Sequence, residues 1–488
     1  MNLDRAHVES FYHLRDFDAE QDGCRGLACF VARHLDPGCW ARACSQSNWV
    51  NCLGECYASP ACGTQAPPPR MEVRAREGIV LSRLAAGSNG SLEEYKSAGG
   101  YTAIARALQR SPAEIVREIE ISQLRGRGGA GFPTGRKWQF MSAGHADQKF
   151  VVANADEGDP GAYIDRFLLE KDPHAILEAM LIAGYATGGN EGYIYLRKEY
   201  PAAKAALKRA LQEARSASLL GRNVLGAGFS FDIKLAMGQG SYVCGEETSL
   251  LNSLEERRPE VRVRPPYPTE RGLFDKPTLV NNVETLANIP WIVLNGGEAY
   301  RQYGFSHSRG TKLVSLNSLF RKPGLYEVEF GIPVRRIVEE VGGGLGNGRL
   351  HGLIIGGPLA GIIPPHLLDT PFGFEELGAI GACVGHGGVM AFDEQTSIAE
   401  LAQQVFAFGA FESCGKCTPC RLGTRRIADL LSGQAAWNSC EFEDIVAALQ
   451  SASLCAMGTG LADFAVSVLR YYREELEICL GSPLTAAR

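Results

Sequence analysis

The sequence predicts a multidomain α/β protein. Its 488 residues exceed the roughly 100–200 residues of an ordinary domain. Between about residues 71 and 300, helical stretches alternate with short apolar strands, the pattern of an α/β layer architecture. The two ends of the chain differ from this middle part and from each other, which indicates further domains.

The first segment, residues 1–63, is rich in cysteine. It contains seven of the 15 cysteines and ends at the proline-rich run TQAPPPR, a credible linker. Most of the other cysteines cluster near the end of the chain. Crowding of this kind favours metal ligation in a reducing compartment over disulfide bonding.

The α/β domain is expected over residues 71–300. Helical periodicity is clear at 104–120 and 202–215, and KFVVAN and GYIYLR are typical of short buried strands. Ligands in such folds bind at the loops that follow the strands. Loops of this domain are therefore the first place to look for a site.

Residues 305–395 show a different pattern. TKLVSLN, GLYEVEFG and LHGLIIGGP are short β-like segments divided by Gly and Pro, with one helix candidate, VRRIVEEVG. A small β-grasp-like domain fits them, either as a docking element or as a packing spacer. From 396 to 488, four stretches have helical periodicity and predict a helical bundle.

Within this last part, ESCGKCTPCR places Cys414, Cys417 and Cys420 three residues apart, and Cys455 follows after a helical stretch. Three evenly spaced thiolates in a tight turn can converge on one cuboidal cluster, which a distant cysteine completes. Zinc sites normally use two separated pairs. The spacing favours a [4Fe–4S] cluster over zinc or unligated core cysteines.

Composition excludes several classes. The formal charge of −6 arises from 49 basic and 55 acidic residues, too balanced for a nucleic-acid surface. The N-terminus lacks a basic start and an apolar core, and no apolar run approaches the ~18 residues of a spanning helix. We therefore expect a cytoplasmic protein without nucleic-acid partners or direct membrane insertion.

A glycine-rich run, GRGGAGFPTGRKW, starts at Gly126 after a helix that should end near Leu124. Its glycines permit close approach of the backbone to a planar or phosphorylated ligand, and Arg136 and Lys137 could neutralise phosphate. It is neither a Walker loop nor in the usual Rossmann context. A nucleotide or flavin loop and a structural glycine turn both remain open.

Three further motifs carry polar groups: NADEGDPG after a strand, GQGSYVCGEETSLLNSLE before a helix, and KPTLVNNVETL. Side chains at such positions can bind ribose, a flavin edge or a cation. The alternatives are an Asp-rich turn, capping of the helix by its carboxylates, and amides that brace a loop.

Taken together, GRGGAGFPTGRKW, NADEGDPGAYIDR, YVCGEETSLLNSLE, KPTLVNNVETL and ESCGKCTPCR resemble, in this order, the NADH-binding flavoprotein subunit of respiratory complex I and its soluble relatives. Those relatives are the diaphorase subunits of NAD-linked hydrogenases and formate dehydrogenases. The resemblance covers about residues 75–480. It implies a Rossmann-like FMN- and NADH-binding domain, an SLBB-type β-grasp domain and a helical bundle with one [4Fe–4S] cluster.

The resemblance also implies site residues. FMN should be surrounded by Gly126, Arg127, Gly128, Lys137, Asn154, Asp156, Glu157, Tyr242, Gly245, Glu246, Glu247, Asn281, Asn282 and Thr285. Rings that stack on the nicotinamide dinucleotide should be Phe132, Phe140 and Tyr267, the last in place of a phenylalanine common in complex I. Asp159 stands where the family has a glutamate that contacts the adenosine ribose, which leaves the choice between NAD and NADP open. No residue is assigned a proton-transfer role, since the cofactor performs the chemistry.

The N-terminal cysteines resemble the thioredoxin-like ferredoxin that accompanies this family. Cys24 and Cys29 form a CxxxxC pair, and Cys52 and Cys56 form a CxxxC pair. Only 22 residues separate the pairs, so the domain would be truncated, and competing ligands are available at Cys39, Cys44 and Cys62. A [2Fe–2S] site, a zinc or other cluster, and a cluster-free relic remain open.

Two functions from different classes follow. The chain is either the diaphorase module of a soluble multisubunit complex or a stand-alone flavoprotein whose clusters are structural. Two separated cysteine groups favour the module, because they imply an electron path to a partner. The fused N-terminal segment and SLCAMG around Cys455 favour a formate dehydrogenase partner over a hydrogenase or complex I. Substrate oxidation would then occur in a catalytic subunit, reached through other Fe–S subunits.

Overall fold

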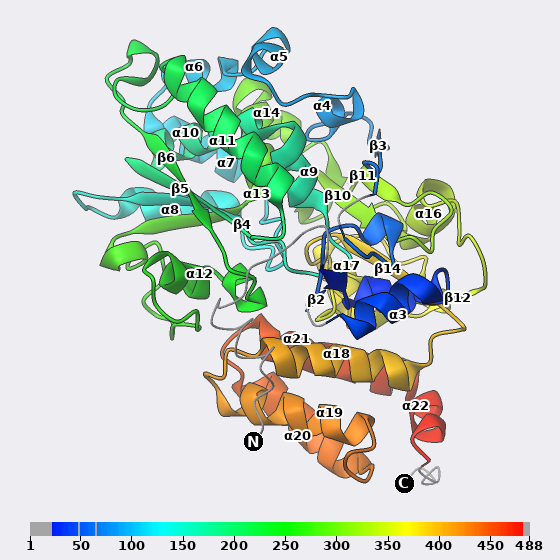
Figure 1. Ribbon diagram of the computed structural model, residues 1–488. Coiled ribbons are helices and arrows are strands. Elements are labelled where there is room, and N and C mark those ends of the chain that lie inside the picture. The colour runs from blue at the N-terminus through cyan, green and yellow to red at the C-terminus, as the bar shows by residue number, and fades with distance from the viewer. Residues whose placement is uncertain (1–21, 47–48, 64–65, 482–488) are drawn as a thin grey trace.

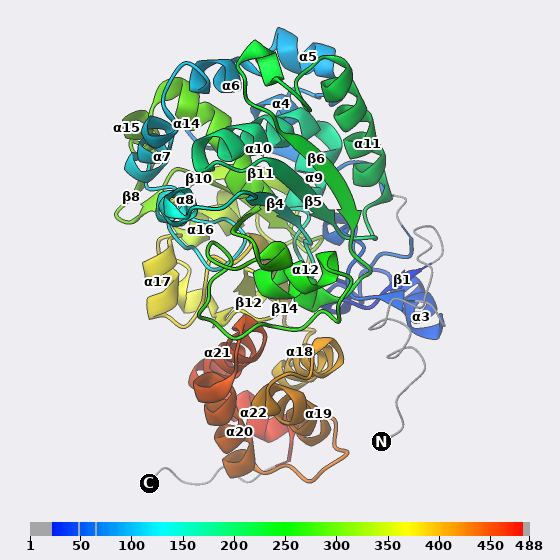
Figure 2. The same ribbon diagram turned by 90° about the vertical axis from the view of Figure 1, so that its left-hand side faces the viewer.

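The computed structural model describes residues 22–46, 49–63 and 66–481. Within them the chain forms a small N-terminal segment, a four-stranded α/β domain, a six-stranded mixed sheet and a C-terminal helical bundle (Figures 1 and 2). This arrangement confirms the predicted multidomain α/β class. No helix among the described residues is long and apolar enough to cross a bilayer.

The N-terminal segment is built on a pair of two-residue parallel strands, β1 (Gly23–Cys24) and β2 (Trp49–Val50). Three short helices join it: α2 (Leu27–Val31), α3 (Pro37–Ser45) and η1 (Cys56–Ala58). The side chain of Asp36 caps α3 by accepting a hydrogen bond from the backbone of Cys39. In Figures 1 and 2 this segment lies beside the six-stranded sheet and above the helical bundle.

The four-stranded sheet is entirely parallel, in the order β6 (Asp232–Met237), β5 (Glu191–Leu196), β4 (Phe150–Ala155), β7 (Thr278–Asn282). The two predicted strands are β4 and β5. Alternate residues of β4 enter different cores: Val151 packs with α10 (Pro173–Thr187), whereas Val152 joins the cluster that includes residues of α12 (Glu247–Leu254). Burial on both faces explains why β4 and β5 are mostly apolar, with Asn154 and Glu191 as their strongly polar members.

Helices flank this sheet in the order α4 (Ser82–Ala85), α5 (Leu92–Ser97), α6 (Thr102–Ala107), α7 (Pro112–Ile121), α8 (Thr134–Ala143), α9 (Ile164–Lys171), α11 (Pro201–Ser216), α13 (Val283–Ala287), α14 (Ile289–Asn295) and α15 (Gly297–Tyr300). The stretch 104–120, expected as one helix, is two. Ser111 and Glu114 form a capping box, and Pro112 occupies the first turn of α7.

The six-stranded sheet has the order β13 (Ile362–Ile363), β12 (Leu350–Ile355), β14 (Gly388–Asp393), β10 (Thr311–Leu316), β11 (Gly324–Glu329), β3 (Arg70–Val73). Short helices α16 (Val334–Arg336) and α17 (Phe374–Ala379) and the hairpin β8 (Gly304–Phe305) and β9 (Ser308–Arg309) accompany it. β3 pairs in parallel with β11 at the sheet edge, a pairing between distant segments that the sequence does not predict.

The C-terminal bundle consists of α18 (Ile398–Glu412), α19 (Thr424–Leu431), α20 (Ser439–Ala452), α21 (Ala456–Tyr471) and α22 (Arg473–Cys479) (Figure 1). Helix α18 lies next to the N-terminal segment, and its last residues approach the loop before α12. The bundle therefore places its first interhelical loop beneath the α/β domain.

Candidate functional site

The carboxyl ends of the parallel strands meet at one edge of the four-stranded sheet. The register pairs Asn154, near the end of β4, with Asn282, at the end of β7. From the loop after β6, the carbonyl of Gly245 accepts a hydrogen bond from the Asn154 side chain at 2.8 Å. Three of the motifs singled out from the sequence thus converge on one edge, where α/β folds bind ligands.

The glycine-rich run forms a closed loop against this edge. Hydrogen bonds from Gly126 N to Phe132 O and from Thr134 N to Leu124 O, both 2.9 Å, close its base. A methyl group on Gly128 would lie 2.8 Å from Cβ of Asn282, so only glycine lets the loop approach β7 this closely. The preceding helix, α7, ends at Ile121 rather than near Leu124.

Arg127 anchors this loop rather than offering its charge to a ligand. Its guanidinium is fully buried, donates to Tyr300 Oη and to the Arg309 carbonyl at 2.9 and 2.7 Å, and lies over the ring of Phe330. The backbone N–H of Arg127 donates to Thr285 Oγ1 at 2.8 Å. Neutralisation of a phosphate is left to other cations.

Lys137 is one such cation. Its ammonium contacts Glu247 Oε2 at 3.0 Å and the Val280 carbonyl at 3.1 Å. Burial acts to raise the pKa of Glu247, but the charges of Lys137 and Arg264 hold it below its ordinary value. Lys137 and Glu247 therefore form an ionised pair at the mouth of the glycine loop.

The end of β4 and the loop after it hold four expected residues in different environments. Asp156 has a buried carboxylate oxygen, Oδ2, without a hydrogen-bond partner in the described chain, and burial raises its pKa to about 8. Asp159 accepts a hydrogen bond from Tyr242 Oη at 2.5 Å. Glu157 instead accepts hydrogen bonds from the first backbone amides of α9 and is buried. Asn154 makes the contact to Gly245 already described.

An FMN molecule fits this donor and acceptor set. Glu246 caps α12 through Oε2, while its Oε1 is buried without a hydrogen-bond partner among the described residues. With Asp156 Oδ2, this gives two buried carboxyl oxygens that can hydrogen-bond to the hydroxyl groups of a ribityl chain. The glycine loop leaves room for a planar group at two positions: nothing lies within 4 Å of where a Cβ of Gly129 would stand, and at Gly126 the nearest atoms are Phe132 backbone atoms at 3.7 and 3.8 Å.

Asn281, Asn282 and Thr285 lie at the junction of β7 and α13. Asn281 accepts a hydrogen bond from the Trp138 indole at 3.1 Å. Asn282 caps α13 by accepting from the Thr285 backbone at 3.1 Å, and its amide donates to Asp165 at 2.6 Å. Both interpretations of this motif have support: the amides brace the loop, and they lie at the expected edge.

The three expected stacking rings are among the most exposed large apolar side chains of the described residues. Phe132 is 42%, Phe140 48% and Tyr267 54% exposed. Singly exposed apolar side chains are common on protein surfaces, so this exposure leaves the three rings accessible to a planar partner without requiring one. Their exposure supports their assignment to nicotinamide dinucleotide binding, which remains a proposal.

The four C-terminal cysteines come together. Cys414 and Cys417 lie in the loop after α18, Cys420 lies in the π-helical turn η7 (Pro419–Gly423) that leads into α19, and Cys455 is the N-cap of α21. All four line one pocket with Val243 from the α/β domain. Burial raises the pKa of Cys420 to about 12 and that of Cys455 to about 11. Binding of cluster iron would stabilise the thiolates and so lower these pKa values.

The four expected N-terminal cysteines also share a site. Cys24, Cys29, Cys52 and Cys56 are buried, and the sulfurs of Cys52 and Cys56 lie 3.6 Å apart. The pKa of Cys56 is raised by its hydrogen bond with Cys52, by burial and by the charges of Cys52, Cys29 and Cys24. The pKa values of Cys29 and Cys56 are thus both raised by other cysteines of the quartet, as expected for thiols that lie close together.

The three competing cysteines lie in two different environments. Cys39 and Cys62 form a disulfide, whereas the sequence predicted metal ligation rather than disulfides in this segment. Cys44 is exposed. Helix α3 carries Cys39 on its buried face, where it meets the chain after η1. The disulfide removes both thiols from the set of possible cluster ligands.

Sequence reasoning missed a set of buried charges around the site: Asp165, Arg197, Lys312, His386 and Glu412. Asp165 lies within NADEGDPGAYIDR and Glu412 directly precedes Ser413 in ESCGKCTPCR, so both were quoted but given no role. His386, flanked by glycines in GHGG, had one available signal, a titratable residue in a tight turn.

Comparison with known proteins bears on this assembly. Residues 119–291 match the family model of the Nuo51 FMN-binding domain, and residues 400–479 match the NADH-ubiquinone oxidoreductase-F iron-sulfur binding region. The NADP-reducing hydrogenase subunit HndC of Solidesulfovibrio fructosivorans is 41% identical over 79% of this chain and 80% of its own length. A subunit of the NADH-quinone oxidoreductase of Aquifex aeolicus is 40% identical over 84% of this chain and 96% of its own length.

A solved structure agrees in fold. The crystal structure of an NAD+-reducing [NiFe]-hydrogenase in the air-oxidized state contains a chain with a TM-score of 0.79 and 27% identity. The match covers 99% of the present chain and 89% of that one. The similarity therefore extends over the bundle and the sheets alike.

Proposed function

This chain belongs to the family of Nuo51-type FMN-binding and oxidoreductase-F iron–sulfur subunits, and we propose that it is the diaphorase module of a multisubunit oxidoreductase. As a family member it is an oxidoreductase with an FMN-binding domain and a [4Fe–4S] region. The observation that carries the proposal is the position of the pocket lined by Cys414, Cys417, Cys420 and Cys455. Val243, from the segment that precedes α12, lines the same pocket. A flavin at the sheet edge would have an electron acceptor next to it.

FMN, when bound, supplies the change from a two-electron hydride exchange with NAD(H) to single-electron transfer. We assign its binding to the sheet edge. Backbone of Gly126, Arg127 and Gly128 would approach the planar ring, and Asp156 and Glu246 would accept from ribityl hydroxyls. Polar contacts would be completed by Lys137, Asn154, Tyr242, Gly245, Glu247, Asn281, Asn282 and Thr285. Glu157, whose carboxylate oxygens accept from the backbone amides of α9, would support the loop that carries Asp156.

The dinucleotide is assigned to the open side of the glycine loop. Phe132 and Phe140 are exposed there, and Tyr267 follows the proline-rich turn after Arg264. Stacking of these rings would hold the nicotinamide over the flavin and exclude water. Asp159, held by Tyr242, would meet the adenosine ribose. Steady-state kinetics with NADH and NADPH would determine the preferred dinucleotide.

A second cluster is assigned to the N-terminal quartet. Cys24, Cys29, Cys52 and Cys56 supply four buried thiols, the number that a [2Fe–2S] cluster requires. Backbone amides of Gly54 and Gly161 donate to Cys52 Sγ at 3.3 Å and Cys56 Sγ at 3.2 Å. Hydrogen bonds of this kind tune the potential of an iron–sulfur cluster.

We further propose that the complex is an NAD-dependent formate dehydrogenase. The fused cysteine-rich segment and SLCAMG around Cys455 support this choice. Anaerobic purification of the native complex, followed by mass spectrometry of its subunits, tests it. A molybdopterin subunit is the expected result, and a nickel–iron subunit or membrane subunits would replace it with a hydrogenase or complex I.

An NAD-reducing hydrogenase is the second candidate. HndC and the hydrogenase chain support it, the former by 41% identity and the latter by a match across 99% of this chain. The two candidates make the same use of the flavin and differ only in the partner subunit. Isolation as a single active species with its own substrate would contradict both.

A further inference from the structure

The six-stranded sheet contributes a loop to the flavin edge. Gly385 makes a backbone bridge with Gly129 of the glycine loop, and Gly387 lies against β10. Both Gly385 and Gly387 have positive φ angles, +52° and +101°, that side-chain-bearing residues rarely adopt. The tight turn presents His386 between the sheet and the α/β domain. The six-stranded sheet therefore contacts the glycine loop directly through this turn.

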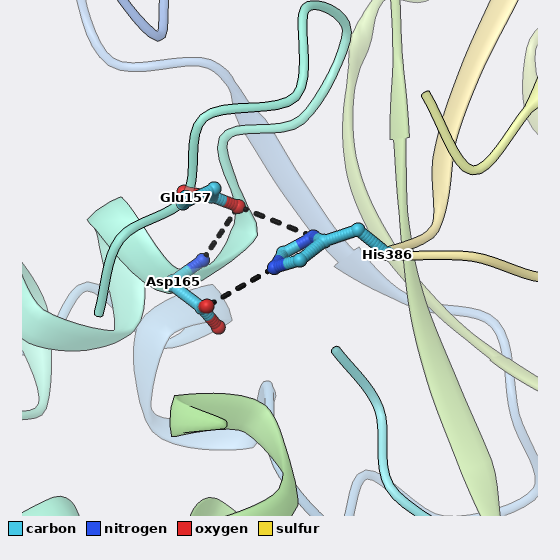
Figure 3. Close-up of side chains that lie close together, drawn as sticks. All are labelled: Glu157, Asp165 and His386. Atoms are coloured by element: carbon cyan, nitrogen blue, oxygen red, sulfur yellow. Dashed lines mark hydrogen bonds and ion pairs between the residues drawn. The ribbon is translucent and has the colours of Figure 1, made fainter. Parts of the chain in front are cut away.

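His386 is buried between two carboxylates. Its Nε2 lies 3.0 Å from Asp165 Oδ2, and its Nδ1 lies 3.4 Å from Glu157 Oε1, as Figure 3 shows. Glu157 belongs to the loop after β4, and Asp165 begins α9. The imidazole therefore connects two parts of the α/β domain from outside it.

These three residues are an ion-pair network and not a metal site. Nε2 of His386 hydrogen-bonds to Asp165, and Nδ1 lies 3.4 Å from Glu157, so each ring nitrogen faces a different carboxylate, as expected of an imidazolium between two anions. The carboxylate oxygens of Glu157 are already occupied by backbone amides of α9 at 2.6 to 3.0 Å. A cation would have to displace these helix contacts.

Asp165 and Glu157 each connect the network to the flavin edge. Asp165 Oδ2 also accepts from the Asn282 amide at 2.6 Å, and Asn282 packs against Gly128. Glu157 is the neighbour of Asp156, which carries the buried unpartnered oxygen. Movement of the imidazole would therefore displace both the amide at β7 and the loop after β4.

We propose that His386 is a positioning residue of the flavin site, whose imidazolium holds Glu157 and Asp165 in place and moderates the negative charge that faces the cofactor. This inference rests on the proposed position of FMN at the sheet edge. It assigns the β-grasp-like domain a part in the redox chemistry of the neighbouring domain.

The charge on His386 follows from its surroundings. Burial alone would lower its pKa, but Asp165 and Glu157 raise it to about 9. Burial also raises the pKa of Glu157, and the charge of His386 opposes this shift. In the state with both carboxylates ionised, the network carries one net negative charge. Other charged groups facing it are Asp159 from the same loop as Glu157, Lys312 from β10 and, paired with Lys312, Glu284 from α13.

A charge series on the full-length chain tests the proposal. His386→Gln makes the network more negative, Glu157→Gln makes it neutral, and the double variant restores the original charge. Reduced FMN carries one more negative charge than oxidised FMN near neutral pH. The affinity for reduced FMN therefore depends more strongly on the charge of the network than the affinity for oxidised FMN does. The readout is the ratio of the affinities for reduced and oxidised FMN, measured by anaerobic equilibrium dialysis with FMN fluorescence.

At pH 7.5 we expect His386→Gln to lower this ratio by about tenfold, which corresponds to about 30 mV for a two-electron couple. Glu157→Gln should raise it by a similar factor, and the double variant should return to within about threefold of wild type. The difference between wild type and His386→Gln should close as the pH rises past about 9, because the wild-type imidazolium loses its proton there.

A purely structural role predicts otherwise. The double variant would then be at least as impaired as either single variant, and that result, or an unchanged ratio in His386→Gln, overturns the proposal. His351→Gln is the matched control, since it removes a half-buried histidine ion-paired at 3.0 Å with Glu475, away from this network. Its ratio should equal that of wild type.

Two safeguards keep the test decisive. Should His386→Gln fail to fold, Asp165→Asn also neutralises the network and must raise the ratio; no rise overturns the proposal. Wild-type protein that binds no FMN removes the proposed site and this inference together. Wild-type protein that binds FMN but yields a flat charge series removes only this inference.

Discussion

The two cysteine sites differ in how deeply the protein encloses them. In the C-terminal site Cys417 and Cys455 are only half-buried, and the exposed apolar residues Leu422 and Leu454 flank them. In the N-terminal site all four cysteines are buried. A cluster near the surface can exchange electrons with a partner over a short distance, whereas an enclosed cluster depends on the protein around it.

The electrostatic surroundings differ in the same way. Exposed Lys416 lies next to the C-terminal thiols and pairs with Glu260. Beside the N-terminal thiols, buried Arg197 donates to the Cys52 carbonyl at 2.8 Å and pairs with buried Glu199 at 3.1 Å. Solvent screens the first charge and not the second. We therefore expect the stability of the C-terminal site to depend mainly on its cysteine ligands, and that of the N-terminal site to depend also on its buried charged neighbours.

Removal of a C-terminal ligand should have the largest effect. Cys455→Ser should cost about four irons per chain, since serine replaces the only ligand from outside the CxxCxxC loop. NADH should still reduce FMN, but the low-temperature paramagnetic signal of the cluster should disappear. Iron analysis and electron paramagnetic resonance check this.

The control for this variant is Cys440→Ser, at an exposed cysteine of the same bundle. It should retain full iron and the full signal. Equal iron in Cys455→Ser and wild type would contradict the ligand assignment at α21.

The matching change in the N-terminal site should have a smaller effect. Cys52→Ser should lose about two irons and leave the C-terminal signal and NADH-driven reduction intact. Cys44→Ser, at an exposed cysteine of the same segment, is the control. Loss of both paramagnetic signals in Cys52→Ser would show that the two sites are not independent, and no iron loss would favour a cluster-free segment.

The same contrast explains what the sequence could predict. The C-terminal ligands come from one short loop and one helix N-cap, so their spacing alone indicates a shared cluster. The strands β4 and β5 are mostly apolar because both faces of the sheet are buried, and that pattern is also local. The strand ends could be placed on one edge because parallel strands share their direction, whereas the glycine loop follows a helix and is grouped with them only through the family resemblance.

Long-range pairings could not be predicted in this way. The side chain of His386 meets Glu157 and Asp165 only because a turn of the six-stranded sheet reaches the α/β domain. Pairing of β3 with β11 joins residues about 250 positions apart. Neither leaves a periodic signal, since each depends on how the two sheets pack. Cys39 and Cys62 likewise gave no spacing that separates a disulfide from metal ligation.

Removal of the buried charge of Arg197 should have the next largest effect. Arg197→Met leaves Glu199 buried without its cation, and breaking such a pair costs about 3–5 kcal/mol. The unpaired carboxylate gains a raised pKa, so the loss of unfolding free energy should be smaller at pH 5.5 than at pH 8. Urea unfolding at both pH values measures it, and a pH-independent loss would contradict the charge argument. Iron should be lost from the N-terminal site first.

Lys416→Gln should give the smallest effect and completes the comparison. Its ion pair with Glu260 is 2.7 Å long, yet the two side chains are 37% and 32% exposed. Exposed pairs contribute roughly 0.2–1 kcal/mol, and salt screens them further. Urea unfolding should therefore shift by less than about 1 kcal/mol and by less still at high salt. A loss as large as that of Arg197→Met would mean that the C-terminal site also depends on its charged neighbours, and that enclosure does not distinguish the two sites.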